Sequence, residues 1–112
     1  GDVYKRQVLW CEISYNIEQE VIQVERKHIK VFGVVQGVGF RYYTQRIAQS
    51  HQIVGTVQNV EDYVEIYAQG EADNLDHFIS EVTNGASPAS KVDDYEIENV
   101  EIDESLKQFT TI

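Results

Sequence analysis

The sequence is short of cysteine and of long apolar runs, and both shortages exclude classes of protein. Its one cysteine, Cys11, cannot form a disulfide within the chain, so the fold does not rest on a disulfide framework. No apolar run approaches the ~18 residues of a helical membrane span, and the first residues lack the basic and apolar regions of a signal peptide. We therefore expect a cytoplasmic protein without a membrane partner.

Basic residues are also scarce. Nine Lys and Arg against nineteen Asp and Glu give a formal net charge of −10. A surface of this sign repels nucleic acids, so we expect no such partner, and any anionic ligand must be held by a local arrangement of donors. The three histidines, His28, His51 and His77, are spread along the chain without the spacing of metal ligands. We expect no metal and no cofactor.

The chain contains no methionine, so Gly1 is not expected to be the residue at which synthesis begins. Residues 1–26 mix apolar and charged side chains without a sustained period. We interpret them as an N-terminal extension outside the fold, with an added edge strand or helix as the alternative. The remaining residues 27–112 are long enough for one domain with its own core.

From His28 onward, apolar patterns change between strand and helix periods with short connections. A break at Glu61 and Asp62 indicates a hairpin. A change of phase near Glu98 and Asn99 indicates a β-bulge in the acidic strand that contains them. The expected strands are 28–35, 53–60, 63–70, 92–102 and 108–112, and the expected helices are 40–51 and 71–85.

The order of elements is therefore βαββαβ with a small strand added. Two strands joined through a helix run parallel, and the hairpin makes the third strand antiparallel to both. Each expected helix has apolar residues at helical spacing, and both helices cover one face of the sheet. These residues are Phe40, Tyr43 and Ile47 in the first helix and Leu75, Phe78, Ile79 and Val82 in the second. The pattern predicts an α+β fold, a ferredoxin-like βαββαβ sandwich, with an antiparallel sheet of four to five strands and two helices on one face.

The segment GVVQGVGFR, residues 33–41, leaves the first strand and enters the first helix. Glycines let backbone N–H groups converge there, and the N-terminus of the helix adds a partial positive charge. Arg41, in the first helical turn, supplies a guanidinium suited to a tetrahedral oxyanion. The residue types alone leave two interpretations open: an anion-binding loop, or a tight turn with a solvated arginine.

This segment resembles the first signature of the acylphosphatases, small enzymes that hydrolyse carboxyl-phosphate anhydrides. The segment GTVQN at residues 55–59 resembles their second signature. AQG at residues 68–70 and GASPASKV at residues 85–92 also look like the family. The resemblance covers residues 28–112, in the order of elements expected above.

The resemblance implies hydrolysis of acyl phosphates to a carboxylate and inorganic phosphate, with Arg41 holding the phosphoryl oxygens and Asn59 positioning the attacking water. It implies a phosphate cradle formed by Gln36, Gly37, Val38, Gly39, Phe40 and Arg41. The chain departs from the family's usual pattern at Val34, at Thr56 and in the hairpin, which is a residue shorter and lacks an Asp-Gly turn. None of these departures touches Arg41 or Asn59.

On this interpretation inorganic phosphate is both product and competitor, and the protein acts as a monomer without a metal. The alternative function is a non-catalytic anion-binding or carbamoyl-phosphate-handling module on the same fold. Turnover of a simple acyl phosphate separates the two. An RNA-binding domain of this fold is disfavoured by the missing aromatic strand motif and by the net charge of −10.

Overall fold

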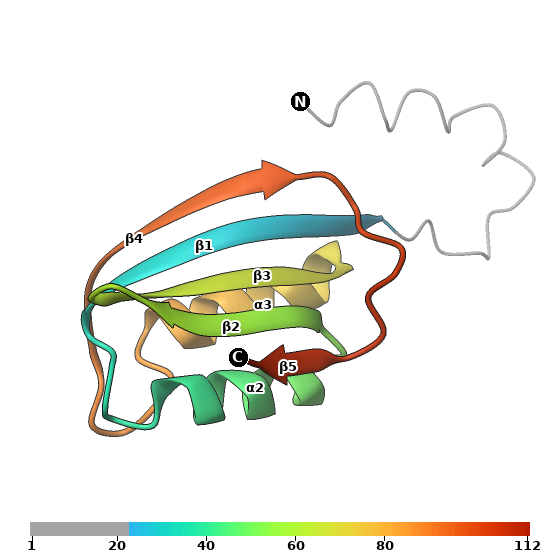
Figure 1. Ribbon diagram of the computed structural model, residues 1–112. Coiled ribbons are helices and arrows are strands. Elements are labelled where there is room, and N and C mark those ends of the chain that lie inside the picture. The colour runs from blue at the N-terminus through green and yellow to red at the C-terminus, as the bar shows by residue number, and fades with distance from the viewer. Residues whose placement is uncertain (1–22) are drawn as a thin grey trace, which may run out of the picture.

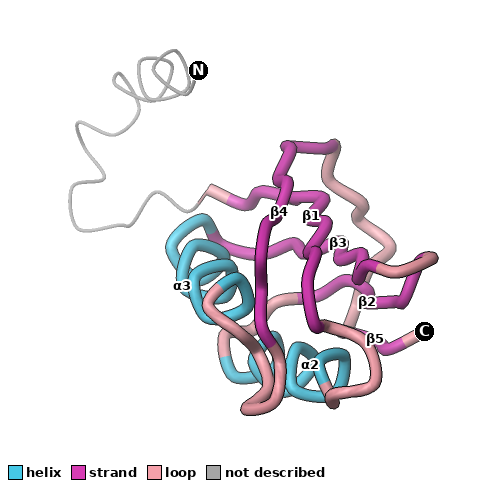
Figure 2. The backbone as a smooth tube through the Cα atoms, turned by 90° about the vertical axis from the view of Figure 1, so that its left-hand side faces the viewer, coloured by secondary structure: helices cyan, strands magenta, loops and turns pink. Residues whose placement is uncertain are grey.

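The computed structural model describes residues 23–112, and the structural statements below concern this part of the chain. Residues 1–22, which make up most of the expected N-terminal extension, lie outside it. Two helices cover one face of a single sheet (Figures 1 and 2). The predicted ferredoxin-like sandwich is confirmed. The elements are β1 (Val24–Val34), α2 (Phe40–Ser50), β2 (Val54–Val60), β3 (Tyr63–Glu71), α3 (Ala72–Thr83), β4 (Lys91–Val100) and β5 (Phe109–Thr111).

The strands lie in the order β4-β1-β3-β2-β5. β1 pairs antiparallel with β3 and β4, and β2 pairs antiparallel with β3. β5 pairs parallel with β2, with Gly55 opposite Phe109 and Val57 opposite Thr111, so the sheet is mixed rather than antiparallel throughout. With β3 between them, β1 and β2 run in the same direction, and their carboxyl ends reach the same end of the sheet.

The core lies between the sheet and the helices. α3 buries Leu75, Phe78 and Val82, which are members of its predicted apolar stripe. They pack with alternate residues of the strands because successive side chains of a strand point to opposite faces. The buried strand residues include Ile29, Val31, Val57, Val64, Ile66, Ala68 and Phe109.

The buried face of α2 differs from its predicted stripe. The residues that α2 buries are Phe40, Thr44 and Ala48, whereas the expected stripe was Phe40, Tyr43 and Ile47. Tyr43 and Ile47 are half-buried beside this contact. The small side chains of Thr44 and Ala48 let the helix lie close to the sheet, so size decides which face is innermost.

The predicted bulge near Glu98 and Asn99 is wrong. Pairing with β1 is continuous through these two residues, and the register shifts at the other end of β4, where Phe32 pairs with Asp94 and Gly33 with Val92. A Cβ at Gly33 would lie 2.8 Å from the nitrogen of Asp93, the extra residue, so the close approach there requires glycine. Because β4 is an exposed edge strand, its apolar pattern says little about register.

The predicted start of the first strand at His28 is also wrong, because β1 begins at Val24. Charged residues hide this part of the strand from an apolar pattern, since its outer face is open to solvent. There the guanidinium carbon of Arg26 lies 4.8 Å from the centre of the Tyr67 ring. Just before β1, the main-chain oxygen of Gln23 accepts a hydrogen bond of 2.9 Å from the backbone N–H of Ala72.

These contacts predict different outcomes for two truncations. Deletion of residues 1–22 keeps every described strand pair and is expected to leave the free energy of unfolding unchanged. Deletion of residues 1–26 also removes Val24, Glu25 and Arg26, which pair with β3. It is expected to lower the free energy of unfolding by about 1–3 kcal/mol, through lost hydrogen bonds and the Arg26 stacking contact. Urea unfolding measures both values, and equal stability of the two truncated proteins would contradict the expectation.

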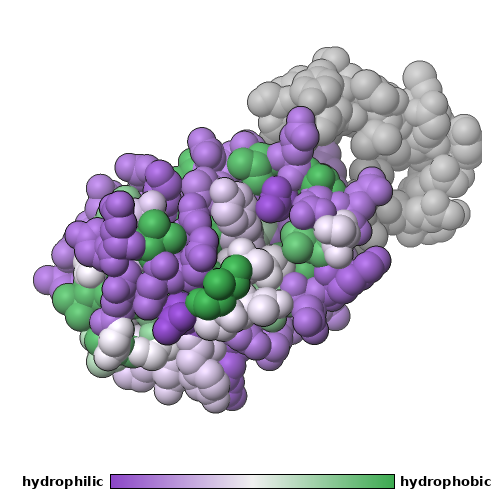
Figure 3. Space-filling model, viewed as in Figure 1, coloured by the Kyte–Doolittle hydropathy of each residue, from purple (hydrophilic) through white to green (hydrophobic). Residues whose placement is uncertain are grey.

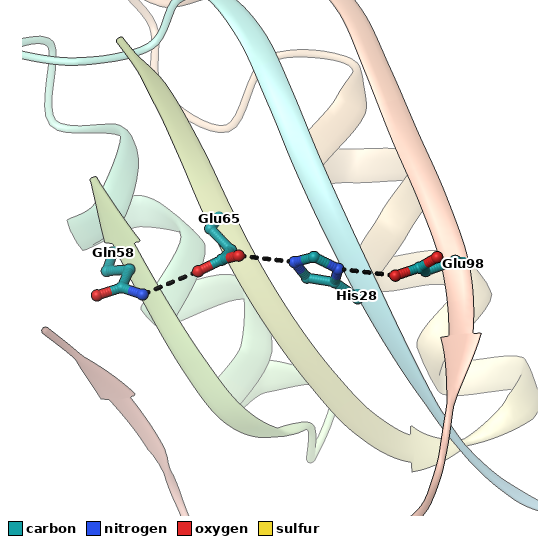
Figure 4. Close-up of polar contacts among 4 residues, drawn as sticks. All are labelled: His28, Gln58, Glu65 and Glu98. Atoms are coloured by element: carbon teal, nitrogen blue, oxygen red, sulfur yellow. Dashed lines mark hydrogen bonds and ion pairs between the residues drawn. The ribbon is translucent and has the colours of Figure 1, made fainter. Parts of the chain in front are cut away.

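The outer face of the sheet carries a row of hydrogen-bonded side chains (Figure 4). Nε2 of His28 lies 2.8 Å from Oε2 of Glu65, and its Nδ1 lies 3.1 Å from Oε2 of Glu98. Nε2 of Gln58 donates to Oε1 of Glu65 at 2.8 Å. The His28 ring stacks on Tyr67 with 4.4 Å between centroids. The row therefore connects β2, β3, β1 and β4 across the sheet.

Glu65 lies at the centre of this row, and its partners act on its acidity. Burial by itself raises the pKa of Glu65, but hydrogen bonds from Gln58 and His28, with the charges of His28 and Lys30, bring this pKa below its usual value. A carboxyl whose pKa is lowered by folding stabilises the fold above its unfolded pKa. That contribution is lost as the pH falls through the folded pKa.

Glu65→Gln is therefore expected to destabilise the fold in a pH-dependent way. The loss of charged hydrogen bonds lowers the free energy of unfolding near neutral pH by about 1–3 kcal/mol. The difference from the wild type shrinks as the pH falls below about 4.3, where the wild type loses the same contribution. Urea unfolding over this pH range checks it, with Glu104→Gln at an exposed position as the control. A difference that stays constant with pH would rule out the charge as its source.

Candidate active site

A hollow of about 360 Å³ opens where the β1–α2 loop meets the ends of β2 and β5. In Figure 1, β5 lies beside β2 and above α2. The two residues expected to carry the chemistry, Arg41 and Asn59, border the same cavity although they come from different elements. The residues that line it are Val35, Gly37, Gly39, Phe40, Arg41, Tyr42, Gln45, Asn59 and Thr111.

The loop owes its shape to two glycines. Gly37 and Gly39 have φ angles of 75° and 80°, a left-handed region that residues with a Cβ disfavour. A Cβ at Gly37 would meet no atom within 4 Å, so this glycine serves the backbone conformation and not a tight space. Gly39 is the N-cap of α2 and has no side chain to occupy the first N–H groups of the helix. These groups accordingly stay available to an anion.

Arg41 is half-buried in the first turn of α2. Its Nη1 donates a hydrogen bond of 2.8 Å to the main-chain oxygen of Ile112. This bond orients the planar guanidinium and leaves further N–H groups for a ligand. The first turn of α2 contains no acidic residue, so no side-chain carboxylate there offsets the positive end of the helix.

Asn59 is the next-to-last residue of β2. Side chains alternate along a strand, so Asn59 lies on the same face as the buried Val57, the face that the helices cover. Asn59 is itself exposed, and solvent reaches its amide. An amide group carries both donors and acceptors, which suits it to hold a water molecule in one orientation.

Most of the predicted cradle residues line the hollow, but Gln36 and Val38 do not. Val38 packs against the hydrophobic core. The side-chain amide of Gln36 donates to the main-chain oxygens of Glu61 and Tyr63 at the β2–β3 turn. A backbone N–H of either residue can still face a ligand, so the six-residue cradle stays a prediction.

Four lining residues, Val35, Tyr42, Gln45 and Thr111, were not predicted. Gln45 follows Arg41 by one helical turn, so helical spacing from Arg41 could have found it. Thr111 hydrogen-bonds the side chain of Gln45 through its hydroxyl. No local pattern connects Thr111 with the loop, because only the pairing of β5 with β2 brings it there.

The hollow offers an anion a guanidinium, backbone N–H groups and neutral polar side chains. Within residues 23–112, no three His, Cys, Asp or Glu side chains gather in a way that could hold a metal ion. In the same residues, no helix has the length and apolar character needed to cross a membrane.

The chain matches the family model described as Acylphosphatase over residues 27–111. The chain belongs to the acylphosphatase family. The curated acylphosphatase of Staphylococcus haemolyticus is 58% identical over 89 residues, which are 80% of this chain and 100% of that protein. The curated relatives of 58% identity are bacterial acylphosphatases. The chain is therefore an acylphosphatase enzyme, and its family acts on small-molecule acyl phosphates.

Solved structures agree with the sequence relatives. The crystal structure of acylphosphatase from Bacillus subtilis is similar with a TM-score of 0.75 at 37% identity, over 80% of this chain and 99% of that one. The crystal structure of full-length HypF in the phosphate- and nucleotide-bound form gives a TM-score of 0.77 at 33% identity. The HypF match covers 83% of this chain but 12% of that chain, so there the acylphosphatase fold is one part of a larger protein.

Substitution of Gly37 tests whether the glycine loop needs glycine for its backbone conformation, since a Cβ there has room. Gly37→Ala places a Cβ in the left-handed region and is expected to lower the free energy of unfolding by about 1–2 kcal/mol. It is also expected to weaken inhibition by inorganic phosphate, because the loop changes shape. Gly37→Asn, whose side chain tolerates this region better, should lose less of both. Urea unfolding and phosphate inhibition constants measure the effects, and an alanine variant as stable as the wild type would contradict them.

Proposed function

We propose that this acylphosphatase uses the hollow to hydrolyse the carboxyl-phosphate bond of small acyl phosphates. The observation that carries the proposal is that Arg41, the glycine loop with the N-terminus of α2, and Asn59 border one cavity. The cradle of residues 36–41 presents N–H donors to the phosphoryl oxygens, and Arg41 adds a planar fork that can bind two oxygens.

The reaction asks for positioning and charge rather than for a nucleophilic side chain. Water attacks phosphorus, the bond between phosphorus and the acyl oxygen breaks, and the carboxylate leaves with the electron pair. The protons of the water pass to the phosphate and to solvent. The carboxylic acid has a pKa of roughly 4 to 5, so it leaves as an anion without a general acid. Alignment and charge neutralisation then stabilise the loose transition state of phosphoryl transfer.

Arg41 and Asn59 divide this work. Arg41 binds the phosphoryl group in the ground state and in the transition state, and its bond to the main chain of Ile112 keeps the fork in one orientation. Asn59 holds the attacking water, for which its exposed amide on the helix-covered face is suited. The two side chains come from α2 and β2, so the fold sets their separation.

The proposal includes a metal-independent monomer in the cytoplasm, without nucleic-acid or membrane partners, and inorganic phosphate as product and competitor. The formal charge of −10 supports the exclusion of polyanionic partners. On the face that Figure 3 shows, apolar residues form separate spots among hydrophilic ones, which supports a monomer.

The alternative is a non-catalytic anion-binding or carbamoyl-phosphate-handling module. The similarity to a small part of HypF favours it, because that chain carries this fold within a larger protein. A binding module would show affinity for inorganic phosphate without releasing phosphate from an acyl phosphate. Release of phosphate from a simple acyl phosphate in the presence of a chelator supports the enzyme and its independence from metal.

The division of work predicts different kinetics for two variants. Arg41→Ala is expected to weaken phosphate inhibition and to lower kcat together, and Arg41→Lys to stay poorly active, since a point charge cannot replace a planar fork. Asn59→Ala is expected to lower kcat by ~10²-fold, about 3 kcal/mol of barrier, with the phosphate inhibition constant nearly unchanged. Steady-state kinetics and phosphate inhibition constants check both.

The matched control for Asn59 is Gln58→Ala. Gln58 is the neighbouring amide residue of β2 and bonds Glu65 on the outer face, away from the hollow (Figure 4). Its replacement should leave kcat near the wild-type value. Turnover of Asn59→Ala close to that of the wild type would remove Asn59 from the mechanism, and unchanged phosphate inhibition of Arg41→Ala would remove Arg41 from the site.

A further inference from the structure

The side chain of Gln36 connects the phosphate loop to the β2–β3 turn. Its Nε2 donates to the main-chain oxygen of Glu61 at 3.0 Å and to that of Tyr63 at 2.9 Å. An amide nitrogen carries two N–H groups, so both donors are used by the turn. Gln36 directly precedes Gly37, the first glycine that lines the hollow. The contact therefore joins the loop that carries the cradle to the hairpin.

The turn that Gln36 holds is poorly supported by its own residues. Val60 and Tyr63 close the hairpin, which leaves Glu61 and Asp62 as its turn residues. Glu61 has a φ of 52°, in the left-handed region that a glutamate rarely adopts. Two-residue hairpin turns usually carry Asn-Gly or Asp-Gly because those residues accept positive φ without strain. The two hydrogen bonds from Gln36 therefore help to hold a turn that its own residues do not favour.

The position of this turn matters because of what lies next to it. Asn59, near the end of β2, precedes Glu61 of the turn by two residues. It lines the hollow together with Gly37 and Arg41. A shift of the turn moves Asn59 relative to the cradle. A displacement of about 1 Å in a reacting group can cost ~10²-fold in rate.

We infer that Gln36 is a positioning residue: its side-chain amide fixes the β2–β3 turn to the phosphate loop and so sets the distance between Asn59 and the bound phosphoryl group. The inference rests on the proposed function, and it assigns to the Gln36 side chain a role other than contact with phosphate. Gln36 acts through Asn59, so its loss affects the alignment of the water and not the binding of phosphate.

Two near-isosteric variants test the inference on the full chain. Gln36→Met keeps the length but removes both donors, and is expected to lower kcat by roughly tenfold to a hundredfold while the phosphate inhibition constant changes by less than about twofold. In Gln36→Glu, a carboxylate faces the two main-chain oxygens near neutral pH and cannot donate a hydrogen bond to either. As the pH falls toward about 4.5 the carboxyl gains a proton and can donate one hydrogen bond, so its kcat relative to the wild type should rise. The relative kcat of Gln36→Met should not change with pH.

A second test asks whether a change in the turn restores the kcat that Gln36→Met loses. Its outcome does not depend on the stability of one variant. The change Glu61→Gly places glycine at the turn residue that has positive φ, so the turn supports its own conformation. Added to Gln36→Met, it is expected to restore most of the lost kcat. A purely structural role of Gln36 would be visible in urea unfolding but would not give this recovery of kcat in protein that is already folded.

The matched control is Gln58→Met, the same exchange on the outer face of β2, which is expected to keep the wild-type kcat. Wild-type turnover in Gln36→Met, or a loss of phosphate inhibition equal to its loss of kcat, would overturn the inference. A rescue variant with no recovery would do the same. Failure of the wild-type chain to release phosphate from an acyl phosphate would instead sink the proposed function, so the two failures are distinguishable.

Discussion

The site depends on the position of β3 between β1 and β2. Because β3 is antiparallel to both, β1 and β2 run in the same direction and finish at the same end of the sheet. The loop after β1 and the amide near the end of β2 become neighbours for this reason alone. The crossover helix α2 starts from that same loop, so its positive end points to the place where both strands finish. One arrangement of three strands thus gathers the donors, the arginine and the amide.

An acidic protein can bind an anion here because the attraction is local. Among residues 23–112, no acidic side chain lines the hollow and none is in the first turn of α2. Charges on a wet surface are screened beyond about 8 Å at physiological ionic strength, so distant carboxylates weaken the site little. The main-chain donors of the loop carry no net charge and cannot be lost by titration. In the proposed function, binding therefore rests on Arg41 and on backbone geometry rather than on the charge of the whole surface.

Local patterns in the sequence were enough for the order of the elements, the hairpin break at Glu61 and Asp62, and the buried stripe of α3. They failed where a strand has no strict inner and outer face, as at the start of β1 and along the exposed β4. The resemblance of the two motifs brought Arg41 and Asn59 forward, and the fold places both at one cavity. The contacts of Arg41 with Ile112 and of Gln36 with the turn join segments far apart in the chain, so no spacing in the sequence encodes them.

The smallest strand has a consequence for how the enzyme responds to warming. β5 is Phe109–Thr111, and it lies at an edge of the sheet with β2 as its only strand neighbour in residues 23–112. Short edge elements open at a lower free energy than the strands at the centre of a sheet. Opening of β5 removes Thr111 from Gln45 and the main chain of Ile112 from Arg41, while the four other strands stay paired. We therefore expect activity to be lost on warming before the sheet unfolds, with the burial of Phe109 in the core limiting how easily β5 opens.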